Sequence, residues 1–207
     1  MNALTTQMEM NMDNTFLPLI FRMRHIRRWS LMRNTQTENL TEHSAECAFV
    51  VNLLAVIGNK YFGRDWDVNK LMAFALFHDI TEVLTGGLPT PVKYFSPDMR
   101  DTYKGIERVA GEKLLAHLPV DLQGEYAGYI SGSGLNGDER LLLKCADKLC
   151  AYIKCVQELD AGNKEFRHAL AALRKQIDKM ECVELQYFIE HCMAAFTMSL
   201  DELKGML

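Results

Sequence analysis

Apolar residues recur at helical spacing along nearly the whole chain, and this pattern predicts an all-α protein. No stretch shows the strict alternation of apolar and polar residues that indicates a half-buried strand. Glycine, proline and asparagine punctuate the pattern where the expected helices end. The predicted helices cover residues 16–26, 40–59, 68–84, 97–118, a short segment from 119, 138–160, and 164–203 as one or two helices.

Several polar or glycine residues mark the ends of these helices. Asn39, with Glu42 three positions later, predicts a capping box at the start of the second helix. Asp138 is the expected cap of the helix over 138–160. Gly86 and Gly87 are expected to stop the helix over 68–84. The proline-rich segment 88–95 that follows is expected to be a loop.

Composition places the chain among ordinary globular proteins. It has 207 residues, 48% hydrophobic and 24% charged, which suits a single domain over residues 15–207. Residues 1–14 are polar and are expected to form a flexible extension. The longest uncharged apolar run, residues 47–58, is too short to span a bilayer, so no membrane association is expected.

Net charge and cysteine usage narrow the binding partners and the cellular compartment that the sequence favours. The net charge of −4 does not favour binding to a nucleic-acid polymer or an anionic membrane. None of the six cysteines forms a Cys-x-x-Cys pair, and most lie within apolar helical patterns. We interpret them as reduced, buried thiols of a cytoplasmic protein.

Four residues in apolar surroundings are candidate metal ligands. His78 and Asp79 end a long apolar run, where burying them is costly unless something compensates the lost solvation. His43 shares a helical face with apolar residues, and Asp147 follows apolar positions on its own helix. Two imidazoles and two carboxylates suit manganese, cobalt, iron or zinc better than magnesium. Such an ion would make a water molecule nucleophilic near neutral pH.

Each of these residues also has an ordinary interpretation. A His-Asp dipeptide arises often by chance, and a lone buried histidine is usually a satisfied core residue. Asp147 could pair with Lys144 or Lys148 across a helix turn. Taken together, the four residues, which come from three predicted helices, favour a metal site.

The phosphate side of a site would need a guanidinium group. Arg28 is the candidate, although the arginines at 22–33 could simply form a solvated basic face. Trp29 could line a pocket or belong to the core. Glu82, one turn after the predicted ligands, could act as a general acid or base, or be a supporting or surface charge.

Longer motifs carry a resemblance to a known family. The order His…His-Asp…Asp is that of the HD superfamily of metal-dependent phosphohydrolases. Segments 28–34, 37–39 with 42–44, 78–79 with 82–86, 88–95, 144 with 146–147, and 150–155 closely resemble the bacterial HD-domain 5'-deoxynucleotidase. The likeness runs in register from about residue 19 to residue 202.

The resemblance implies an all-helical HD-domain fold and a homodimer that hydrolyses deoxyribonucleoside 5'-monophosphates. It implies that Arg28 orients the phosphate and that Glu82 assists proton transfer. Trp29 would disfavour a 2'-hydroxyl group. The metal ligands would be His43, His78, Asp79 and Asp147. Two of them, Asp79 and Asp147, would also face the substrate. The residues that line the sugar side would be Gly87, Leu88, Pro89 and Thr90.

One departure from the family pattern concerns the substrate. The family has an aspartate where this chain has Gly87, which has no side chain to accept a hydrogen bond from a sugar hydroxyl. The metal and phosphate residues are intact, so phosphohydrolase chemistry is expected to remain. Two alternatives stay open: an HD phosphohydrolase for another small phosphate ester, and a nucleotide-sensing protein with weak turnover.

Overall fold

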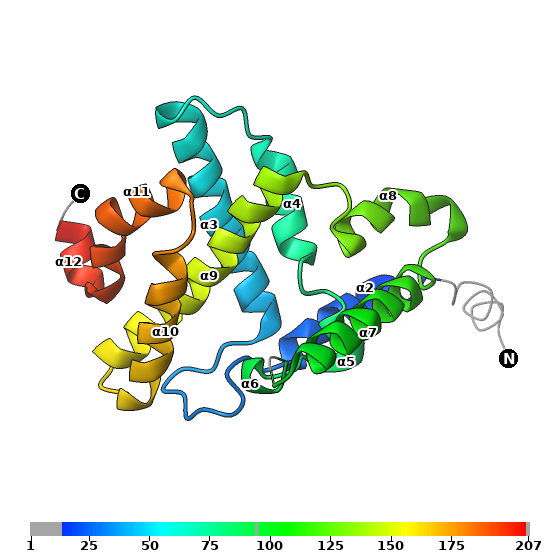
Figure 1. The fold of residues 1–207 in the computed structure, drawn as a ribbon, viewed down its shortest axis with the longest axis horizontal. Coiled ribbons are helices and arrows are strands. Elements are labelled where there is room, and N and C mark those ends of the chain that lie inside the picture. The colour runs from blue at the N-terminus through cyan, green and yellow to red at the C-terminus, as the bar shows by residue number, and fades with distance from the viewer. Residues whose placement is uncertain (1–13, 94, 206–207) are drawn as a thin grey trace, which may run out of the picture. The chain divides into compact units, whose positions relative to one another are not determined.

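The computed structural model describes residues 14–93 and 95–205, and within these ranges it contains helices and no strand (Figure 1). The predicted all-α class is confirmed for this part of the chain. The predicted extension falls almost entirely on residues 1–13, which lie outside the described residues. The described chain divides into two compact units, each assembled from separate stretches. The expectation of a single domain stays a prediction.

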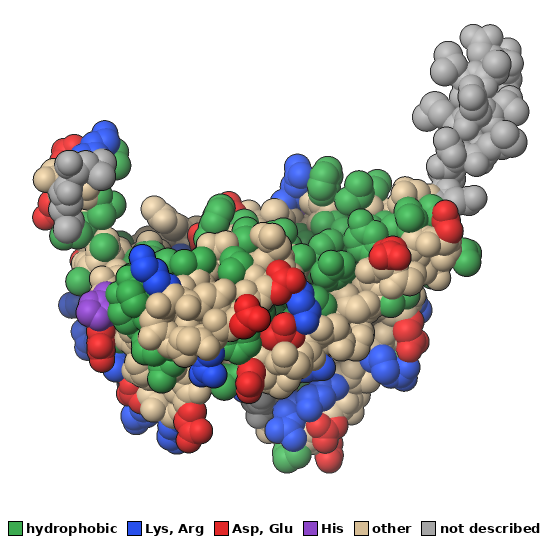
Figure 2. All heavy atoms as spheres, turned by 90° about the horizontal axis from the view of Figure 1, so that it is seen from above, with side chains coloured by type: hydrophobic (Ala, Val, Ile, Leu, Met, Phe, Trp, Pro, Cys, Tyr) green, Lys and Arg blue, Asp and Glu red, His purple; other side chains and the backbone are tan. Residues whose placement is uncertain are grey.

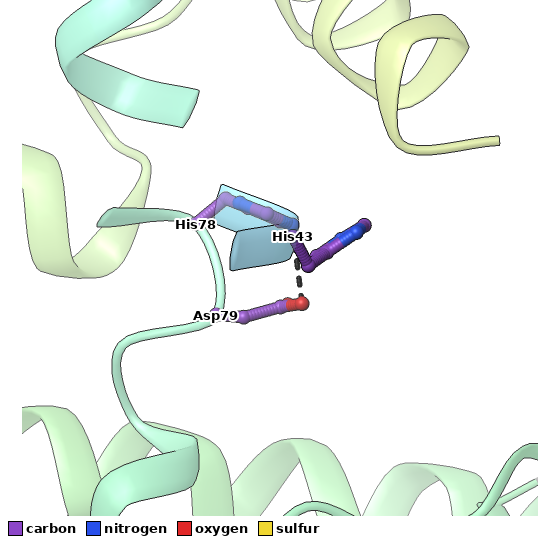
Figure 3. Close-up of side chains that lie close together, drawn as sticks. All are labelled: His43, His78 and Asp79. Carbon is purple, nitrogen blue, oxygen red and sulfur yellow. Dashed lines mark ion pairs between the residues drawn. The ribbon is translucent and has the colours of Figure 1, made fainter. Parts of the chain in front are cut away.

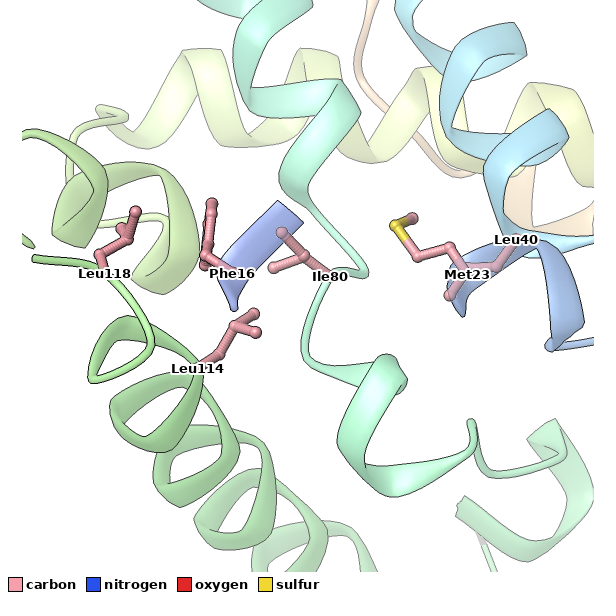
Figure 4. Packing of buried hydrophobic residues seen from close by; sticks show 6 residues of the cluster. All are labelled: Phe16, Met23, Leu40, Ile80, Leu114 and Leu118. Carbon is pink, nitrogen blue, oxygen red and sulfur yellow. The ribbon is translucent and has the colours of Figure 1, made fainter. Parts of the chain in front are cut away.

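The first unit holds residues 14–30, 38–42 and 77–134. Its elements are α2 (Phe16–Ile20), η1 (Phe21–His25), α5 (Glu82–Thr85), α6 (Thr90–Lys93), α7 (Pro97–Leu115) and α8 (Val120–Ser131). Burying a large apolar side chain contributes about 1.5–3 kcal/mol, so its core is a main source of stability. The buried core side chains in Figure 4 are Phe16, Met23, Leu40, Ile80, Leu114 and Leu118.

The predicted helix over 68–84 is wrong at residues 78–81, which are not helical. The helix α4 (Val68–Phe77) ends before the His-Asp pair, and a turn leads from it into α5. Ile80 inside this turn is 1% exposed and belongs to the core of the first unit. A continuous helix is replaced by a turn in which Ile80 N–H donates to the carbonyl of Phe77, at 3.1 Å. Gly86 then stops α5 in the left-handed conformation, as predicted.

Two further expectations for the first unit need correction. The segment 88–95 is not a loop throughout, because Thr90–Lys93 forms the short helix α6. The first predicted helix tightens into the 3-10 helix η1 after Ile20. Proline is well tolerated in a first helical turn, which explains how Pro91 fits near the start of α6.

The second unit holds residues 31–37, 43–76 and 135–205 of the described chain. The helix α3 (Leu40–Tyr61) enters it from the first unit, and its cap is the predicted one. Asn39 Oδ1 accepts from the amide of Glu42 at 3.1 Å, and the Glu42 carboxylate accepts from the amide of Asn39 at 2.9 Å. The other elements are α4, α9 (Gly137–Asp160), η2 (Lys164–Phe166), α10 (Arg167–Ile177), α11 (Val183–His191), η3 (Met193–Thr197) and α12 (Leu200–Gly205).

Two details of the second unit differ from expectation. The cap of α9 is Asn136, which forms a reciprocal capping box with Glu139, rather than Asp138. Asp138 instead lies in the first turn, where a negative charge also favours the helix. The segment after residue 163 is a series of short elements rather than one or two helices.

A buried carboxylate on α9 holds the loop of residues 31–37. Glu158 is 1% exposed and accepts hydrogen bonds from the amides of Thr35 and Gln36. The ammonium group of Lys154 donates both to Glu158 and to the carbonyl of Gln36. Asn163 donates to the same carboxylate at 2.8 Å. We call these residues the loop anchor, because they fix the backbone of the loop onto α9.

The helix α3 is the one helix of the described chain that is long and apolar enough to cross a membrane. Just over half of its apolar window, 56%, is buried inside the protein. A core helix of a soluble protein meets the same criterion, so the feature by itself indicates a central helix as readily as a span. On the face drawn in Figure 2, positive and negative side chains lie interspersed among apolar ones.

Candidate active site

His78 and Asp79 occupy the turn between α4 and α5. The buried residues Phe74 and Ala75 on one side and Ile80 on the other fix this turn. The side chains of His78 and Asp79 remain partly accessible, at 12% and 26%. They form a pair in which His78 Nε2 lies 3.1 Å from Asp79 Oδ2 (Figure 3). The turn therefore presents an imidazole and a carboxylate together.

His43 and Asp147 form a second pair, within the second unit. His43 lies in the first turn of α3, is fully buried, and shares its face with the buried residues Cys47 and Val51, as predicted. Its Nε2 atom lies 3.3 Å from Asp147 Oδ1 on α9. The other oxygen of Asp147 lies 3.6 Å from Lys148 Nζ, so one of the two expected lysine pairs is also present.

Three of the four predicted ligands meet the geometric requirement for a shared ion. His43, His78 and Asp79 each offer one ligand atom, and these atoms lie within 4.8 Å of one another. Two imidazoles and a carboxylate are a donor set that suits first-row divalent ions such as zinc, cobalt and manganese. The residues present therefore fit a metal ion. Asp147 is outside this group of three but contacts its buried histidine.

Arg28 and Trp29 are held by one carboxylate. Glu38 accepts from Arg28 Nε at 2.9 Å through one oxygen and from Trp29 Nε1 at 3.0 Å through the other. The Nη1 atom of Arg28 lies 3.6 Å from Asp79 Oδ2, beside a predicted ligand. Arg28 therefore does not belong to a solvated basic face, because its side chain is only 19% exposed.

Glu82 lies at the start of α5, and the pKa of its carboxyl group is strongly raised. Burial, and next the negative charge of Asp79, raise the pKa of its carboxyl from 4.5 to about 7. The positive charges of Arg28 and Lys93 oppose the rise without cancelling it. A carboxyl with a pKa near neutrality can both take and give a proton at physiological pH.

Gly87 adopts a left-handed backbone conformation, with φ of 69°, and faces Glu82. A Cβ atom at this position would lie 2.5 Å from Glu82 Oε2 and 3.2 Å from its Cδ. The carboxylate of Glu82 thus occupies the space that a side chain at position 87 would need. The absence of a side chain at position 87 therefore leaves room for the Glu82 carboxylate.

The rest of the predicted substrate segment follows Gly87 directly. Leu88 and Pro89 are partly buried, and the carbonyl of Pro89 accepts from the amide of Lys93 at 3.0 Å. Thr90 begins α6, and its side chain lies outside the described part of the structure. Lys93 joins this segment to α7, since its Nζ atom lies 2.9 Å from Glu107 Oε1.

Sequence reasoning missed two residues near these groups. Glu38 lies in one of the segments that resemble the family, and its contacts with both Arg28 and Trp29 are not evident from the sequence. Lys93, which the sequence places in an expected loop, acts to lower the pKa of Glu82 through its positive charge. The position of Glu38 inside segment 37–39, which resembles the family, was the available signal for the first of these.

Solved structures of other proteins identify the fold of this protein. An HD-domain phosphohydrolase from Listeria innocua matches 92% of this chain and 92% of its own, with a TM-score of 0.77 at 19% identity. A cyanophage S-2L HD phosphohydrolase, solved with dA and one catalytic Zn²⁺ ion, matches 86% and 95%, with a TM-score of 0.60 at 21% identity. The chain therefore has the all-helical HD-domain fold, as predicted.

Sequence comparison then gives the family. The chain belongs to the 5'-deoxynucleotidase YfbR-like family, whose model matches residues 15–196. A 5'-deoxynucleotidase of Photorhabdus laumondii is 43% identical over 188 residues, which are 91% of this chain and 95% of the relative. One from Pectobacterium atrosepticum is 43% identical over 194 residues, 94% of this chain and 97% of the relative. The resemblance drawn from the motifs is confirmed.

Proposed function

We propose that this protein hydrolyses deoxyribonucleoside 5'-monophosphates to a deoxynucleoside and phosphate. Family membership supports the reaction class, and the relatives carry the name 5'-deoxynucleotidase. The observation that carries the proposal is the meeting of three ligand atoms from His43, His78 and Asp79 beside a guanidinium group and a near-neutral carboxyl. The site thus offers residues to bind a metal ion, to bind the phosphate group and to transfer a proton.

A divalent cation, held by His43, His78, Asp79 and Asp147, is the proposed cofactor. Cobalt and manganese are the ions we expect, and zinc has the precedent of the cyanophage enzyme. When bound, such an ion supplies Lewis acidity at the phosphoryl group and makes a water molecule more acidic. The fully buried His43 can hold its ligand atom in place because its ring is packed on all sides.

The protein's own side chains supply the remaining chemistry. Arg28 is proposed to bind the phosphate through its terminal nitrogens, because Glu38 already engages the Nε side of the guanidinium group. Glu82 is proposed to hold the proton that the leaving deoxynucleoside oxygen requires, since its pKa of about 7 allows the carboxyl to be protonated at working pH.

Sugar recognition is proposed to involve Trp29 and the segment from Gly87 to Thr90. Trp29 has a fixed indole position because its Nε1 atom is hydrogen-bonded to Glu38. Asp79 and Asp147 would face the substrate as well as the metal. Because Gly87 lacks a side chain, the nearest carboxylate in that region belongs to Glu82. This arrangement is the one observation that favours another small phosphate ester as an alternative substrate.

The cellular location, oligomeric state and binding partners of the enzyme are also proposals. We expect a cytoplasmic homodimer that does not bind a nucleic-acid polymer. Apolar side chains at helical spacing on α3 remain exposed, at 71% for Phe49, 40% for Leu53 and 42% for Val56, and such a stripe fits a subunit contact. Light scattering at several protein concentrations would give the oligomeric state.

A phosphate-release screen tests the proposed function. Purified protein would be assayed with each deoxyribonucleoside and ribonucleoside 5'-monophosphate in manganese, cobalt and zinc. We expect release from the deoxy substrates to exceed release from their ribo counterparts. Equal rates on both would remove the deoxy preference, and nucleotide binding without phosphate release would favour the sensing alternative.

A further inference from the structure

Glu38 is placed opposite Arg28 by a short antiparallel pairing of two segments. The amide of Arg28 donates to the carbonyl of Glu38 at 3.0 Å, and the amide of Leu40 donates to the carbonyl of Ile26 at 3.0 Å. A bridge between Arg27 and Asn39 lies between these two bonds. Glu38 is thus held in position by its backbone, and its side chain is 10% exposed.

The two groups that Glu38 holds lie on consecutive residues with an uncommon backbone. Trp29 has a φ of 55°, the one positive value for a residue other than glycine in the described chain. Such a conformation is strained for a bulky side chain and persists only where the surroundings impose it. The hydrogen bond from Trp29 Nε1 to Glu38 is one such constraint.

Each oxygen of the carboxylate has a separate donor. Arg28 Nε uses Oε1 and Trp29 Nε1 uses Oε2, so neither bond can move without disturbing the other. Charge-assisted bonds of this kind are about twice as strong as bonds between neutral groups. A different nitrogen of the same guanidinium group, Nη1, lies 3.6 Å from Asp79 Oδ2.

We infer that Glu38 is a positioning residue that couples the phosphate-binding Arg28 to the sugar-discriminating Trp29. This inference rests on the proposed function, which assigns those two roles. Its distinctive consequence is that a change at Trp29 alters phosphate binding through Glu38. A second consequence is that a change at Glu38 alters both phosphate binding and the preference for deoxy substrates.

The chain contains a matched control for this constellation. Glu184 in the second unit also accepts from an arginine Nε, that of Arg64 at 3.0 Å, and from an indole Nε1, that of Trp66 at 3.3 Å. It is 1% exposed, so the burial is at least as complete as at Glu38. Glu184→Gln therefore imposes the same chemical change on the same three residue types.

The probe for the Arg28 side is inorganic phosphate, which has no sugar to contact Trp29. Its dissociation constant would be measured by calorimetry on manganese-loaded protein, for Glu38→Gln, Trp29→Phe and Glu184→Gln. We expect phosphate to bind about tenfold more weakly to Glu38→Gln and several-fold more weakly to Trp29→Phe, by analogy with other broken charge-assisted bonds. Glu184→Gln should bind it as the wild type does. Trp29→Phe keeps the carboxylate, so it supplies the test if Glu38→Gln does not fold.

The sign of the effect separates positioning from charge. Removing a carboxylate near an anion site should tighten phosphate binding if only charge matters. Tighter or unchanged binding in both Glu38→Gln and Trp29→Phe would therefore overturn the inference, as would wild-type protein that binds no phosphate. Because this readout needs no turnover, it is separate from failure of the proposed function, which would appear as wild-type protein that releases no phosphate.

The effect on the role of Trp29 is measured as the preference for deoxy over ribo substrates. The ratio of kcat/KM for dAMP to that for AMP should fall about tenfold in Glu38→Gln and stay at the wild-type value in Glu184→Gln, which is a free-energy difference of about 1.4 kcal/mol. An unchanged ratio in Glu38→Gln would contradict the coupling. A fall of the same size in Glu184→Gln would show a general loss of structure and would also contradict it.

Discussion

Glu82 is a partly buried carboxylate and Glu158 a fully buried one, and the protein shifts their pKa values in opposite directions. Burial acts to raise the pKa of each. At Glu158 the hydrogen bonds from Lys154, Thr35 and Asn163 outweigh burial and lower the pKa to about 2. At Glu82 the next largest influence is the charge of Asp79, and the pKa rises to about 7. A carboxylate supplied with donors holds structure, whereas one left beside another negative charge remains ready to exchange a proton.

The largest expected difference between the two is in turnover. Glu82→Gln cannot exchange a proton and should lower kcat by about 10²–10⁴-fold, the usual size of a general acid-base contribution. Glu158→Gln should keep kcat within about threefold at a temperature where it is folded, because in the proposed mechanism Glu158 has no role in proton transfer. Both values come from phosphate release at saturating substrate. Equal losses in the two variants would remove the functional distinction.

The next largest effect is on the free energy of unfolding, and here Glu158→Gln rather than Glu82→Gln should show the loss. Glu158→Gln presents an amide NH₂ group to donors that need an acceptor, and it leaves Lys154 without its carboxylate. Breaking a buried ion pair in this way costs about 3–5 kcal/mol. Urea unfolding at pH 7 should show this loss. Asp178→Asn, which breaks the exposed pair with Arg174, is the matched control and should cost less than about 1 kcal/mol.

The pH dependence of stability should follow the sign of each pKa shift. The folded pKa of Glu158 lies below 4.5, so its stabilisation is complete above about pH 4.5 and is lost as pH falls towards 2. Wild-type protein should therefore lose about 3 kcal/mol more than Glu158→Gln across this range, since one pKa unit corresponds to about 1.4 kcal/mol. Parallel acid-unfolding curves for the two proteins would contradict this assignment.

Glu82 should affect stability in the other direction. Between pH 4.5 and about 7 the unfolded chain has released the proton that the folded protein still holds, so stability falls as pH rises through this window. In metal-free protein, Glu82→Gln should therefore be more stable than wild type by about 2 kcal/mol above pH 7 and equal to it near pH 4, allowing for partial solvent access. A variant less stable than wild type at pH 8 would disprove the raised pKa.

The smallest expected effect concerns Gly87. Gly86 and Gly87 are both left-handed, but a Cβ atom meets nothing within 4 Å at Gly86 and meets the Glu82 carboxylate at Gly87. Gly86→Asp and Gly87→Asp should each lose about 1 kcal/mol from backbone strain. Only Gly87→Asp should also move the acidic group in the pH-rate profile upwards, by about one unit, because it adds a like charge beside Glu82. The same shift in both variants would exclude a specific effect on Glu82.

The sequence predicted well those features that depend on regular helices. His43 was expected on the buried face of its helix because Cys47 and Val51 follow at helical spacing, and all three are buried. The cap formed by Asn39 and Glu42 was likewise visible as a short local pattern. Such features are set by neighbours in the chain, which a single sequence contains.

The turn at His78 was not predictable, because the apolar positions continue through it with helical spacing. What ends α4 is the burial of Ile80 in the core of the first unit, a tertiary contact that no local pattern encodes. The role of Glu38 was hidden for a related reason. It depends on pairing between two irregular segments that have no periodicity, and on the positive φ of Trp29.

We propose that a divalent ion held around His78 and Asp79 is required for phosphate release. The most direct test strips the protein of metal with a chelator, titrates manganese back, and follows phosphate release from dAMP alongside metal binding by calorimetry. We expect activity to rise in proportion to one bound ion per chain, and Asp79→Ala to lose at least about 10³-fold in turnover together with most of its affinity for metal. Full activity in the chelated protein, or unchanged activity in Asp79→Ala, would show that phosphate release does not require this ion.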